Sequence, residues 1–363
     1  MSEDLAMRRA LELARRGWGR VHPNPMVGAV VLAGEEPLAE GYHAEYGREH
    51  AERVALAAAG DRARGATLVV TLEPCAHTGK QPPCVEAIVA AGIRRVVAAA
   101  ADPNPEAGDG AGLLRAAGIE VRIGLEERTA RLQNAAFFHR YRNPARPWVA
   151  LKLATSLDSR IADREGRSKW ISGPAAREFA QALRAGFDAV AVGGRTALRD
   201  DPALTVRGPL APRVPPRRVL FQGSEPLPET LTAIHTAKDL GTTVVVPHAA
   251  AAVTQARLGP HGVEVIAAGT LAQALAALRR AGVGALLVEG GGRLAGALLR
   301  EALVDRFYWI QSPLWLGEAG VPAVSGWDQA GLAEAERWSV VERRALGEDT
   351  LLVLDREPCS PAS

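Results

Sequence analysis

The 363-residue sequence has few cysteines, few aromatic residues and no excess of charge of either sign. It has three cysteines, an odd number, and Cys359 lies in a polar tail, so we expect no disulfide framework and favour a reducing, cytoplasmic compartment. A formal net charge of +2 without a basic run argues against a nucleic-acid partner. The chain has no run of 18 apolar residues and no apolar signal core near Met1, which argues against a membrane partner.

The length suggests two domains, and a stretch rich in Arg and Pro, "HRYRNPARPW" (139–148), is a plausible boundary. We place the domains at 1–145 and 146–359. Helical and β-rich segments alternate in both, which indicates layered α/β folds. Helices are expected at 3–17, 49–60, 83–93, 173–186, 270–282 and 293–303, with a helix and a strand within 110–124. Strands are expected at 27–33, 38–43, 67–72, 94–101, 148–156, 187–194, 217–221, 242–247, 263–269 and 284–292. The segment 207–218 is expected to be an exposed loop.

Four residues of the first half have the chemistry of a catalytic zinc site. Such a site has three protein ligands and leaves the fourth position to water, and His50, Cys75 and Cys84 would supply the three. Glu52 follows His50 by two residues, so we expect it near the metal without binding it. There it could carry protons between the water and a leaving amine. We expect one zinc ion per chain.

The spacing of the two cysteines leaves alternatives open. Zinc nucleobase deaminases have His-x-Glu followed by Pro-Cys-x-x-Cys. The chain has "HAE" and "PC", but eight residues separate Cys75 from Cys84. Cys84 could therefore be no ligand, or His77 could complete a structural four-ligand site. The order of strand, helix with HAE, strand with "TLEPC" and helix favours the catalytic site.

The second half has no GxGxxG after an early strand, so it lacks the familiar dinucleotide fingerprint. "LLVEGGGRLAGALL" (286–299) instead indicates a strand, three glycines and a helix, which suits a phosphate or only a tight turn. In "GGRTALRDDPALTVR" (193–207), Asp200 and Asp201 could form a capped turn. Arg207, and Arg184 in the preceding helix, could be solvated or hold a phosphate.

Taken together, these motifs resemble the bifunctional deaminase–reductase family of riboflavin biosynthesis. The stretches "HPNPMVGAVV", "GYHAEYGREHAE", "TLEPCAHTGKQPPC" and "DPNP" are similar to its deaminase half, which has the long cysteine spacing. The stretches "LKLATSLDSRIA" (151–162) and "SKWISG" (168–173) are similar to its reductase half. The resemblance implies a cytidine-deaminase-like three-layer α/β/α domain followed by a dihydrofolate-reductase-like α/β domain. It also implies zinc, NADPH, a phosphorylated pyrimidine substrate and a homo-oligomer, either a dimer or a tetramer.

The resemblance also assigns further residues. Around the deaminase pyrimidine or its phosphate it implies Asn24, His43, Lys80 and Asn104. Around NADPH it implies Ala154, Trp170, Thr196, Asp200, Gly291, Gly292, Arg293, Leu294, Ala295, Gly296 and Ala297. Around the ribose phosphate of the reductase substrate it implies Ser168, Arg184, Leu204, Arg207 and Glu289.

Plainer explanations exist for some of these residues. Asn24 between prolines could serve a turn, Lys80 could be loop charge, and Trp170 could belong to the core. The chain also departs from the family at three positions. Arg53 stands where an apolar residue is commoner, Ser159 replaces a usual Gly, and Gln222 lies where an Asp is common. The last change puts any cofactor contact through that segment in doubt.

Two rival functions follow from the same residues. One is a zinc deaminase of RNA or free nucleosides with a non-catalytic C-terminal domain, which the near-neutral charge disfavours. The other is a zinc-stabilised binding protein without activity, which the pairing of HAE with PC disfavours. We favour the hypothesis that the protein removes ammonia from 2,5-diamino-6-ribosylamino-4(3H)-pyrimidinone 5′-phosphate. It would then reduce the ribosyl group of the product to ribityl with NADPH.

Overall fold

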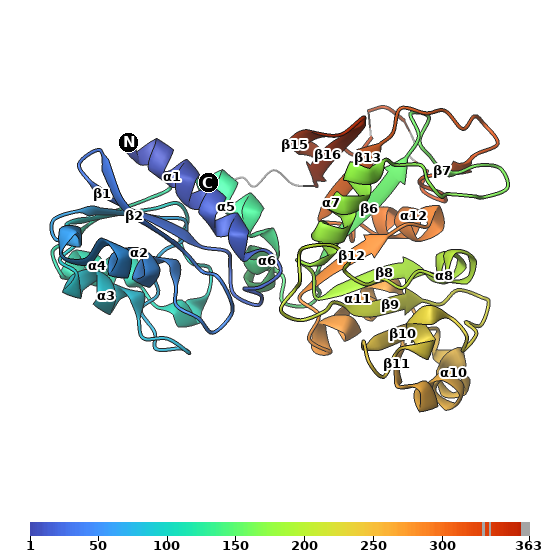
Figure 1. Ribbon diagram of the computed structural model, residues 1–363. Helices are drawn as coiled ribbons and strands as arrows, with labels where there is room; N and C mark the ends of the chain where they lie inside the picture. Colours follow the sequence, from blue (N-terminus) through green and yellow to red (C-terminus); the bar gives the residue numbers. More distant parts are fainter. Residues whose placement is uncertain (329–330, 334, 357–363) are drawn as a thin grey trace. The chain divides into compact units, whose positions relative to one another are not determined.

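The computed structural model describes residues 1–328, 331–333 and 335–356, which form two compact units that divide between Arg142 and Asn143 (Figure 1). The boundary expected from the sequence lies a few residues later, at 145/146. Cys359 and the expected end of the second domain lie outside the described residues. No described helix is both long and apolar enough to cross a membrane.

The first unit is built on a five-stranded sheet with the order β2-β1-β3-β4-β5. Its strands are β1 (Gly28–Ala33), β2 (Glu36–Tyr42), β3 (Thr67–Val70), β4 (Arg95–Ala98) and β5 (Glu120–Ile123). Its helices are α1 (Glu3–Ala14), α2 (Ala51–Ala59), α3 (Cys84–Ala90), α4 (Gly110–Ala116), α5 (Glu127–Gln133) and α6 (Ala135–Arg142). Short 3-10 turns lie at Arg15–Gly17, Gly60–Ala63 and Pro105–Ala107.

Helices cover both faces of this sheet, and glycines allow the closest approaches. A Cβ on Gly28 would lie 2.0 Å from the carbonyl oxygen of Ala10 in α1, and one on Gly41 would lie 2.4 Å from that of Ala51 in α2. Gly28 pairs with Tyr42 in the strand register, so Gly41 faces the other side of the sheet. Helices α1 and α2 therefore lie on opposite faces, which gives three layers (Figure 1).

Strands β3, β4 and β5 are parallel, so their carboxyl ends lie at one edge of the sheet. The segment 71–83 follows β3, and the segment 99–109 follows β4. Both segments thus reach the same edge, although they are far apart in the sequence. This edge carries the candidate zinc site.

The second unit is built on a nine-stranded sheet with the order β11-β10-β9-β8-β12-β6-β13-β16-β15. Its strands are β6 (Trp148–Thr155), β8 (Ala189–Gly193), β9 (Arg217–Phe221), β10 (Thr242–Val246), β11 (Val263–Ala267), β12 (Ala285–Glu289), β13 (Arg306–Gln311), β15 (Ser339–Leu346) and β16 (Asp349–Asp355). A small second sheet pairs β7 (Arg160–Ala162) with β14 (Val321–Pro322). The helices are α7 (Pro174–Arg184), α8 (Gly194–Asp200), α9 (Thr232–His235), α10 (Ala251–Leu258), α11 (Leu271–Arg280) and α12 (Gly292–Arg300), with 3-10 turns at His248–Ala250 and Gly259–His261.

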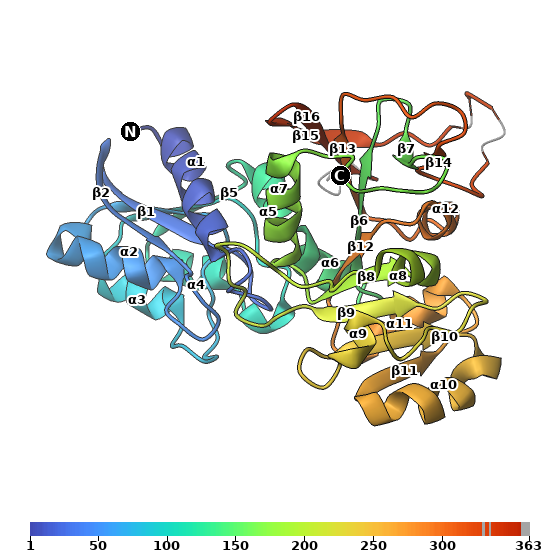
Figure 2. The ribbon, with the colours of Figure 1, turned by 45° about the vertical axis from the view of Figure 1, so that its right-hand side comes forward.

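Seven neighbouring strands of this sheet, from β11 to β13, are parallel (Figure 2). The carboxyl ends of β6, β8, β9 and β12 consequently open toward one edge. Ligands of open parallel sheets bind in the crevice outside these ends. We therefore expect a cofactor to bind at this edge of the sheet.

The elements expected from the sequence are present, but the structure adds others. Helix α6 runs through the first four residues of the expected boundary, because Pro144 is the first residue there that cannot continue a helix. The periodicity of the chain did not predict α5, α8, α9, α10, β13, β15 or β16. Ser159 adopts φ of 58°, a left-handed conformation in which glycine is favoured, which explains why this position suits a Gly.

Candidate active sites

The three expected zinc ligands lie together at the carboxyl edge of the first sheet. The ligand atoms of His50, Cys75 and Cys84 all lie within 4.8 Å of one another. Nδ1 of His50 is 3.6 Å from Sγ of Cys75 and 3.3 Å from Sγ of Cys84. His50 precedes the first turn of α2, and Cys84 begins α3. The eight intervening residues form a loop that returns the second sulfur to the first, so the long spacing is compatible with both as ligands.

The electrostatics of this group suit a divalent cation. Hydrogen bonding to Cys84 lowers the pKa of the Cys75 thiol to about 4, with a further contribution from His50. The neighbouring Cys75 raises the pKa of Cys84. A dication that contacts both sulfurs would favour the thiolate form of both. Within the described residues the group has three members, and His77 is not one of them, so one zinc coordination position would stay open.

Glu52 lies in the first turn of α2 and lines the cavity beside this group. Its side chain is buried, and that burial raises the pKa of the carboxyl group. A carboxyl group with a raised pKa holds a proton more readily than a solvated one, which suits a group that accepts a proton and then passes it on. The geometry thus suits the proton-carrying role expected from the sequence.

The cavity at this site has a volume of about 230 Å³, and all four expected pocket residues line it, namely Asn24, His43, Lys80 and Asn104. His43 Nδ1 lies 3.0 Å from the carbonyl oxygen of Glu49, so that nitrogen donates. The other ring nitrogen then accepts from Asn24 Nδ2 at 3.2 Å, and burial lowers the pKa of His43. A neutral His43 therefore fixes the Asn24 amide, which leaves its carbonyl oxygen to accept from a ligand.

Sequence reasoning missed several residues that also line this cavity. Asp102 lies at its edge, and burial raises the pKa of its carboxyl group to about 6. Glu73 accepts hydrogen bonds from the backbone of Asp102 and Ala111, so it joins the loops that follow β3 and β4. Arg140 and Tyr141 come from α6. The motif "DPNP" contains Asp102. Arg140 lies in the segment 139–148, which the sequence led us to assign to the domain boundary.

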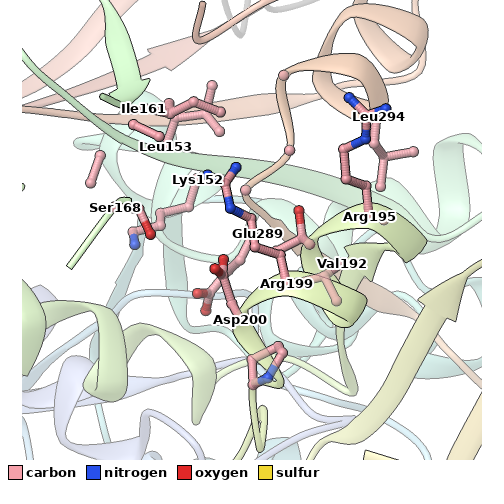
Figure 3. Close-up of a pocket in the computed structure, with 18 of the residues that line it drawn as sticks. Lys152, Leu153, Ile161, Ser168, Val192, Arg195, Arg199, Asp200, Glu289 and Leu294 are labelled. Atoms are coloured by element: carbon pink, nitrogen blue, oxygen red, sulfur yellow. The ribbon is translucent and has the colours of Figure 1, made fainter. Parts of the chain in front are cut away.

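The carboxyl edge of the second sheet holds a larger cavity, of about 1240 Å³. Figure 3 shows labelled side chains from β6, β8, β12, α8 and α12 around it. Its lining includes most residues expected around NADPH: Ala154, Trp170, Thr196, Asp200, Gly291, Gly292, Arg293 and Leu294. It also includes all five expected around the ribose phosphate: Ser168, Arg184, Leu204, Arg207 and Glu289.

The last three residues of the expected glycine loop, 295–297, lie in a helix and away from the cavity. Helix α12 already begins at Gly292, and Ala295, Gly296 and Ala297 do not line the cavity. Ala295 is fully buried, and a Cβ on Gly296 would lie 2.0 Å from the carbonyl oxygen of Ser325. These residues pack the helix against its neighbours. Gly290 and Gly291, with φ of 70° and 85°, form the actual turn.

This turn fits a phosphorylated cofactor. A Cβ on Gly291 would lie 2.9 Å from Thr196 Oγ1, so the bare backbone keeps that space open. The turn leads into α12, whose first backbone N–H groups favour an anion. Trp170 is 69% exposed rather than part of the core, and Arg177 lies over its ring at 4.6 Å. An indole face at the cavity suits an aromatic ring of a ligand.

The departure from the family pattern at Gln222 has a local explanation. Gln222 does not line the cavity, although its neighbours Phe221 and Gly223 do. Its Oε1 accepts from the backbone N–H of Leu227 instead. The neighbouring acids Asp200 and Asp201 both line the cavity. The carboxylate of Asp201 also accepts hydrogen bonds from the backbone N–H and the hydroxyl of Thr232.

A buried charged cluster forms one wall of the large cavity. Arg184 donates to both carboxylate oxygens of Glu289, at 2.6 and 3.0 Å, and to the carbonyl of Thr205. Lys152 in β6 lies opposite Glu289 in the strand register and lines the cavity. Burial lowers the pKa of Lys152, while the charge of Glu289 opposes that change. A lone Lys within the apolar stretch "WVALKLATS" was the signal that sequence reasoning missed.

Comparison with known proteins agrees with these two sites. Residues 1–100 match the cytidine and deoxycytidylate deaminase zinc-binding region, and residues 147–352 match the RibD C-terminal domain. The riboflavin biosynthesis protein RibD of Aquifex aeolicus is 41% identical over 315 residues, which cover 86% of this chain and 87% of that protein. RibD of Escherichia coli is 38% identical over 375 residues, covering 98% and 99%.

Solved structures give the same result. RibD of Acinetobacter baumannii, form 1, matches with a TM-score of 0.84 and 36% identity, covering 97% of this chain and 98% of that one. A diaminohydroxyphosphoribosylaminopyrimidine deaminase/5-amino-6-(5-phosphoribosylamino)uracil reductase of Thermotoga maritima matches with a TM-score of 0.83 and 34% identity, covering 98% and 99%.

These matches confirm the resemblance and the two expected α/β folds, and they confirm zinc and NADPH as cofactors. They do not support the rival with a non-catalytic C-terminal domain, nor the rival without activity, because both halves match enzyme domains. The chain belongs to the RibD family of bifunctional riboflavin-biosynthesis enzymes, which join a zinc-dependent deaminase to a reductase.

Proposed function

We propose that residues 1–145 deaminate 2,5-diamino-6-ribosylamino-4(3H)-pyrimidinone 5′-phosphate and that residues 146–359 then reduce the ribosyl group of the product to ribityl. The observation that carries the first step is the convergence of His50, Cys75 and Cys84 beside the buried Glu52. The name of the Thermotoga relative supports the choice of substrate.

In the deaminase site, His50, Cys75 and Cys84 would hold zinc, which would supply the Lewis acidity that makes water a nucleophile at neutral pH. Glu52 accepts a proton from that water and delivers it to the amine that leaves the ring. Asn24, oriented by the neutral His43, accepts a hydrogen bond from the pyrimidine. The burial of Glu52 keeps bulk water from competing for its proton.

In the reductase site, NADPH supplies the hydride when it is bound. The hydride adds to C1′ of the ribose as the bond from C1′ to O4′ breaks. O4′ keeps the electron pair of that bond and needs a proton. Lys152 holds a suitable proton in the cavity wall, and Glu289, fixed by Arg184, keeps the ammonium in place. Arg207 is exposed at the same cavity, and we propose that it binds the ribose phosphate.

We also propose a cytoplasmic location, since both ligand thiols must stay reduced to bind zinc. A homo-oligomer, either a dimer or a tetramer, is part of the same proposal on the strength of the family alone. Size-exclusion chromatography with light scattering tests the oligomer directly.

The decisive experiment follows ammonia release and NADPH absorbance at once, with the diaminopyrimidinone phosphate as substrate. The wild-type enzyme should release ammonia without NADPH, and it should consume NADPH only after ammonia appears. Glu52→Gln should retain zinc and slow ammonia release by about 10²- to 10⁴-fold. Glu49→Gln is the matched control, because that exposed carboxylate lies just before the same helix. Full turnover in Glu52→Gln would exclude the proton-carrying role.

A further inference from the structure

One face of helix α6 lines the deaminase cavity without a role in the proposed chemistry. Phe137, Arg140 and Tyr141 line the cavity, and their spacing of three and four residues puts them on one side of the helix. The rings of Phe137 and Tyr141 meet edge to face, with centroids 5.3 Å apart. Phe138 is buried in the core instead, and Arg142 is exposed outside the cavity lining.

The zinc-ligand end of this cavity is already assigned. His50, Cys75 and Glu52 lie there, and Asn24 and His43 are linked to each other nearby. A pyrimidine ring that reacts at this end must direct its ribosyl phosphate toward other residues of the lining. Those that carry positive charge are Arg48, Lys80 and Arg140.

Arg140 lines the cavity without a carboxylate partner in the described part of the chain. It is half-buried, and the described residues contain no ion pair between it and a carboxylate. Arg131, in the preceding helix α5, is paired with Glu127 and lies over the ring of Phe138. Arg140 is hydrogen-bonded to the side chain of Tyr141. A guanidinium group has five donors, so Arg140 can still bind a phosphate in a bidentate manner.

The acids that line the same cavity do not pair with Arg140. Glu52 lies beside the zinc ligands, and Glu73 accepts from the backbone of Asp102 and Ala111. Asp102 accepts from the backbone N–H of Asn104 at 2.9 Å, which directs its carboxylate to its own loop. Lys80 lies over the ring of Tyr46 at 4.2 Å, so a second cation is held at the cavity by an aromatic ring rather than by a carboxylate. Arg140 and Lys80 therefore bring two cations to one cavity, and neither forms an ion pair with a carboxylate of the described residues.

We propose that Arg140 binds the 5′-phosphate of the deaminase substrate, assisted by Lys80. The proposal rests on the proposed function for the identity of the substrate. Arg140 discriminates the phosphorylated substrate from its dephosphorylated counterpart and takes no part in proton transfer. Helix α6 thus belongs to the substrate site and is more than a connection to the second unit.

The test compares two ligands in four full-length proteins: wild type, Arg140→Ala, Arg140→Lys and the control Arg142→Ala, which removes an exposed cation from the same helix. The substrate and its dephosphorylated nucleoside are bound calorimetrically to zinc-loaded Glu52→Gln versions of each protein. Arg140→Ala should weaken binding of the phosphorylated ligand by roughly 10- to 100-fold, the usual strength of a hydrogen bond to a charged group. It should leave binding of the nucleoside within about twofold, and Arg142→Ala should change neither.

Turnover in the active proteins provides an independent readout. Arg140→Ala should raise KM for ammonia release with kcat nearly unchanged, because the phosphate contact is the same in the ground state and the transition state. Arg140→Lys should recover part of the loss. Equal losses for both ligands, or none for the phosphorylated one, would overturn the proposal.

Ribose 5-phosphate separates this proposal from the proposed function. Its binding to wild type, and its weaker binding to Arg140→Ala, would support the phosphate site even if the wild-type enzyme released no ammonia. If Arg140→Ala loses zinc or unfolds early, Arg140→Gln takes its place, since it keeps the length and polarity of the side chain. Unchanged ribose 5-phosphate binding in a folded, zinc-loaded variant would count against Arg140.

Discussion

The two units assemble their sites in different ways. In the first unit, the three expected ligand residues and the proposed proton carrier come from two short motifs, and a single metal ion would bind all three ligands. In the second unit, the cavity is assembled from the ends of four parallel strands and two helix starts, with side chains from positions 152 to 325. The first site depends on a few residues of fixed chemistry, whereas the second depends on many that are positioned by the sheet.

This difference predicts different responses to mutation. A site held by one ion should fail completely when one ligand is lost. A site built from many residues of a sheet should lose only part of its activity when one side chain is replaced. Some of these substitutions should lower the free energy of unfolding rather than the activity. Three predictions test this contrast, beginning with the one of largest expected effect.

Removal of one sulfur should abolish the first site. Cys84→Ala should lose the single bound zinc and its ammonia release, because a site with three protein ligands is left with two. Reduction of added deaminated substrate should continue at the wild-type rate, since that cavity lies in the other unit. Metal analysis and the two separate assays measure these effects.

The matched control for this prediction is His77→Ala, which removes a histidine from the same loop but not from the ligand group. It should retain zinc. Zinc retained by Cys84→Ala, or lost from His77→Ala, would favour a different ligand set. Loss of reductase activity in Cys84→Ala would contradict the independence of the two sites.

Replacement of Lys152 should slow the reductase reaction without preventing NADPH from binding. Lys152→Met should lower the reductase kcat by about 10²-fold, the lower range for loss of a proton donor, with NADPH binding unchanged. In the wild type, burial lowers the pKa of Lys152 from the ordinary 10.5. A donor acts only while protonated, so the reductase rate should fall as pH rises through that lowered pKa.

The pH profile distinguishes this role from a structural one. Lys152→Met should lose the alkaline decline together with the rate, while Lys238→Met, which removes an exposed lysine outside the cavity lining, should keep both. An alkaline decline that persists unchanged in Lys152→Met would assign the titration to another group.

Disruption of the buried ion pair should show mainly as lost stability. Glu289→Gln leaves the buried Arg184 without its carboxylate, and breaking such a pair costs about 3 kcal/mol of unfolding free energy. Glu165→Gln removes a partner of the exposed Arg164 and should cost less than about 1 kcal/mol. Urea unfolding of the full chain measures both. Equal costs would mean that Arg184 finds another partner.

The sequence predicted most of the first site because its chemistry is local. His50 and Glu52 are two residues apart at the start of one helix, and the cysteines flank one loop. Arg140 and Asp102 escaped notice because their roles depend on which loop and helix meet at the edge of the sheet. In the second unit, Lys152 and Glu289 are 137 positions apart, and only their pairing in β6 and β12 brings them together.

The sequence by itself determined the candidate zinc ligands and proton carrier, the alternation of helices and strands, and the glycine turn before α12. These features arise from the preferences of individual residues and from short periodic patterns, which a linear chain already contains. Only the tertiary structure decided that Cys84 returns to Cys75, that α12 begins before Ala295, and that Lys152 lies opposite Glu289. Those outcomes depend on loop paths and strand register, because distances between side chains remote in sequence exist only once the sheets have formed.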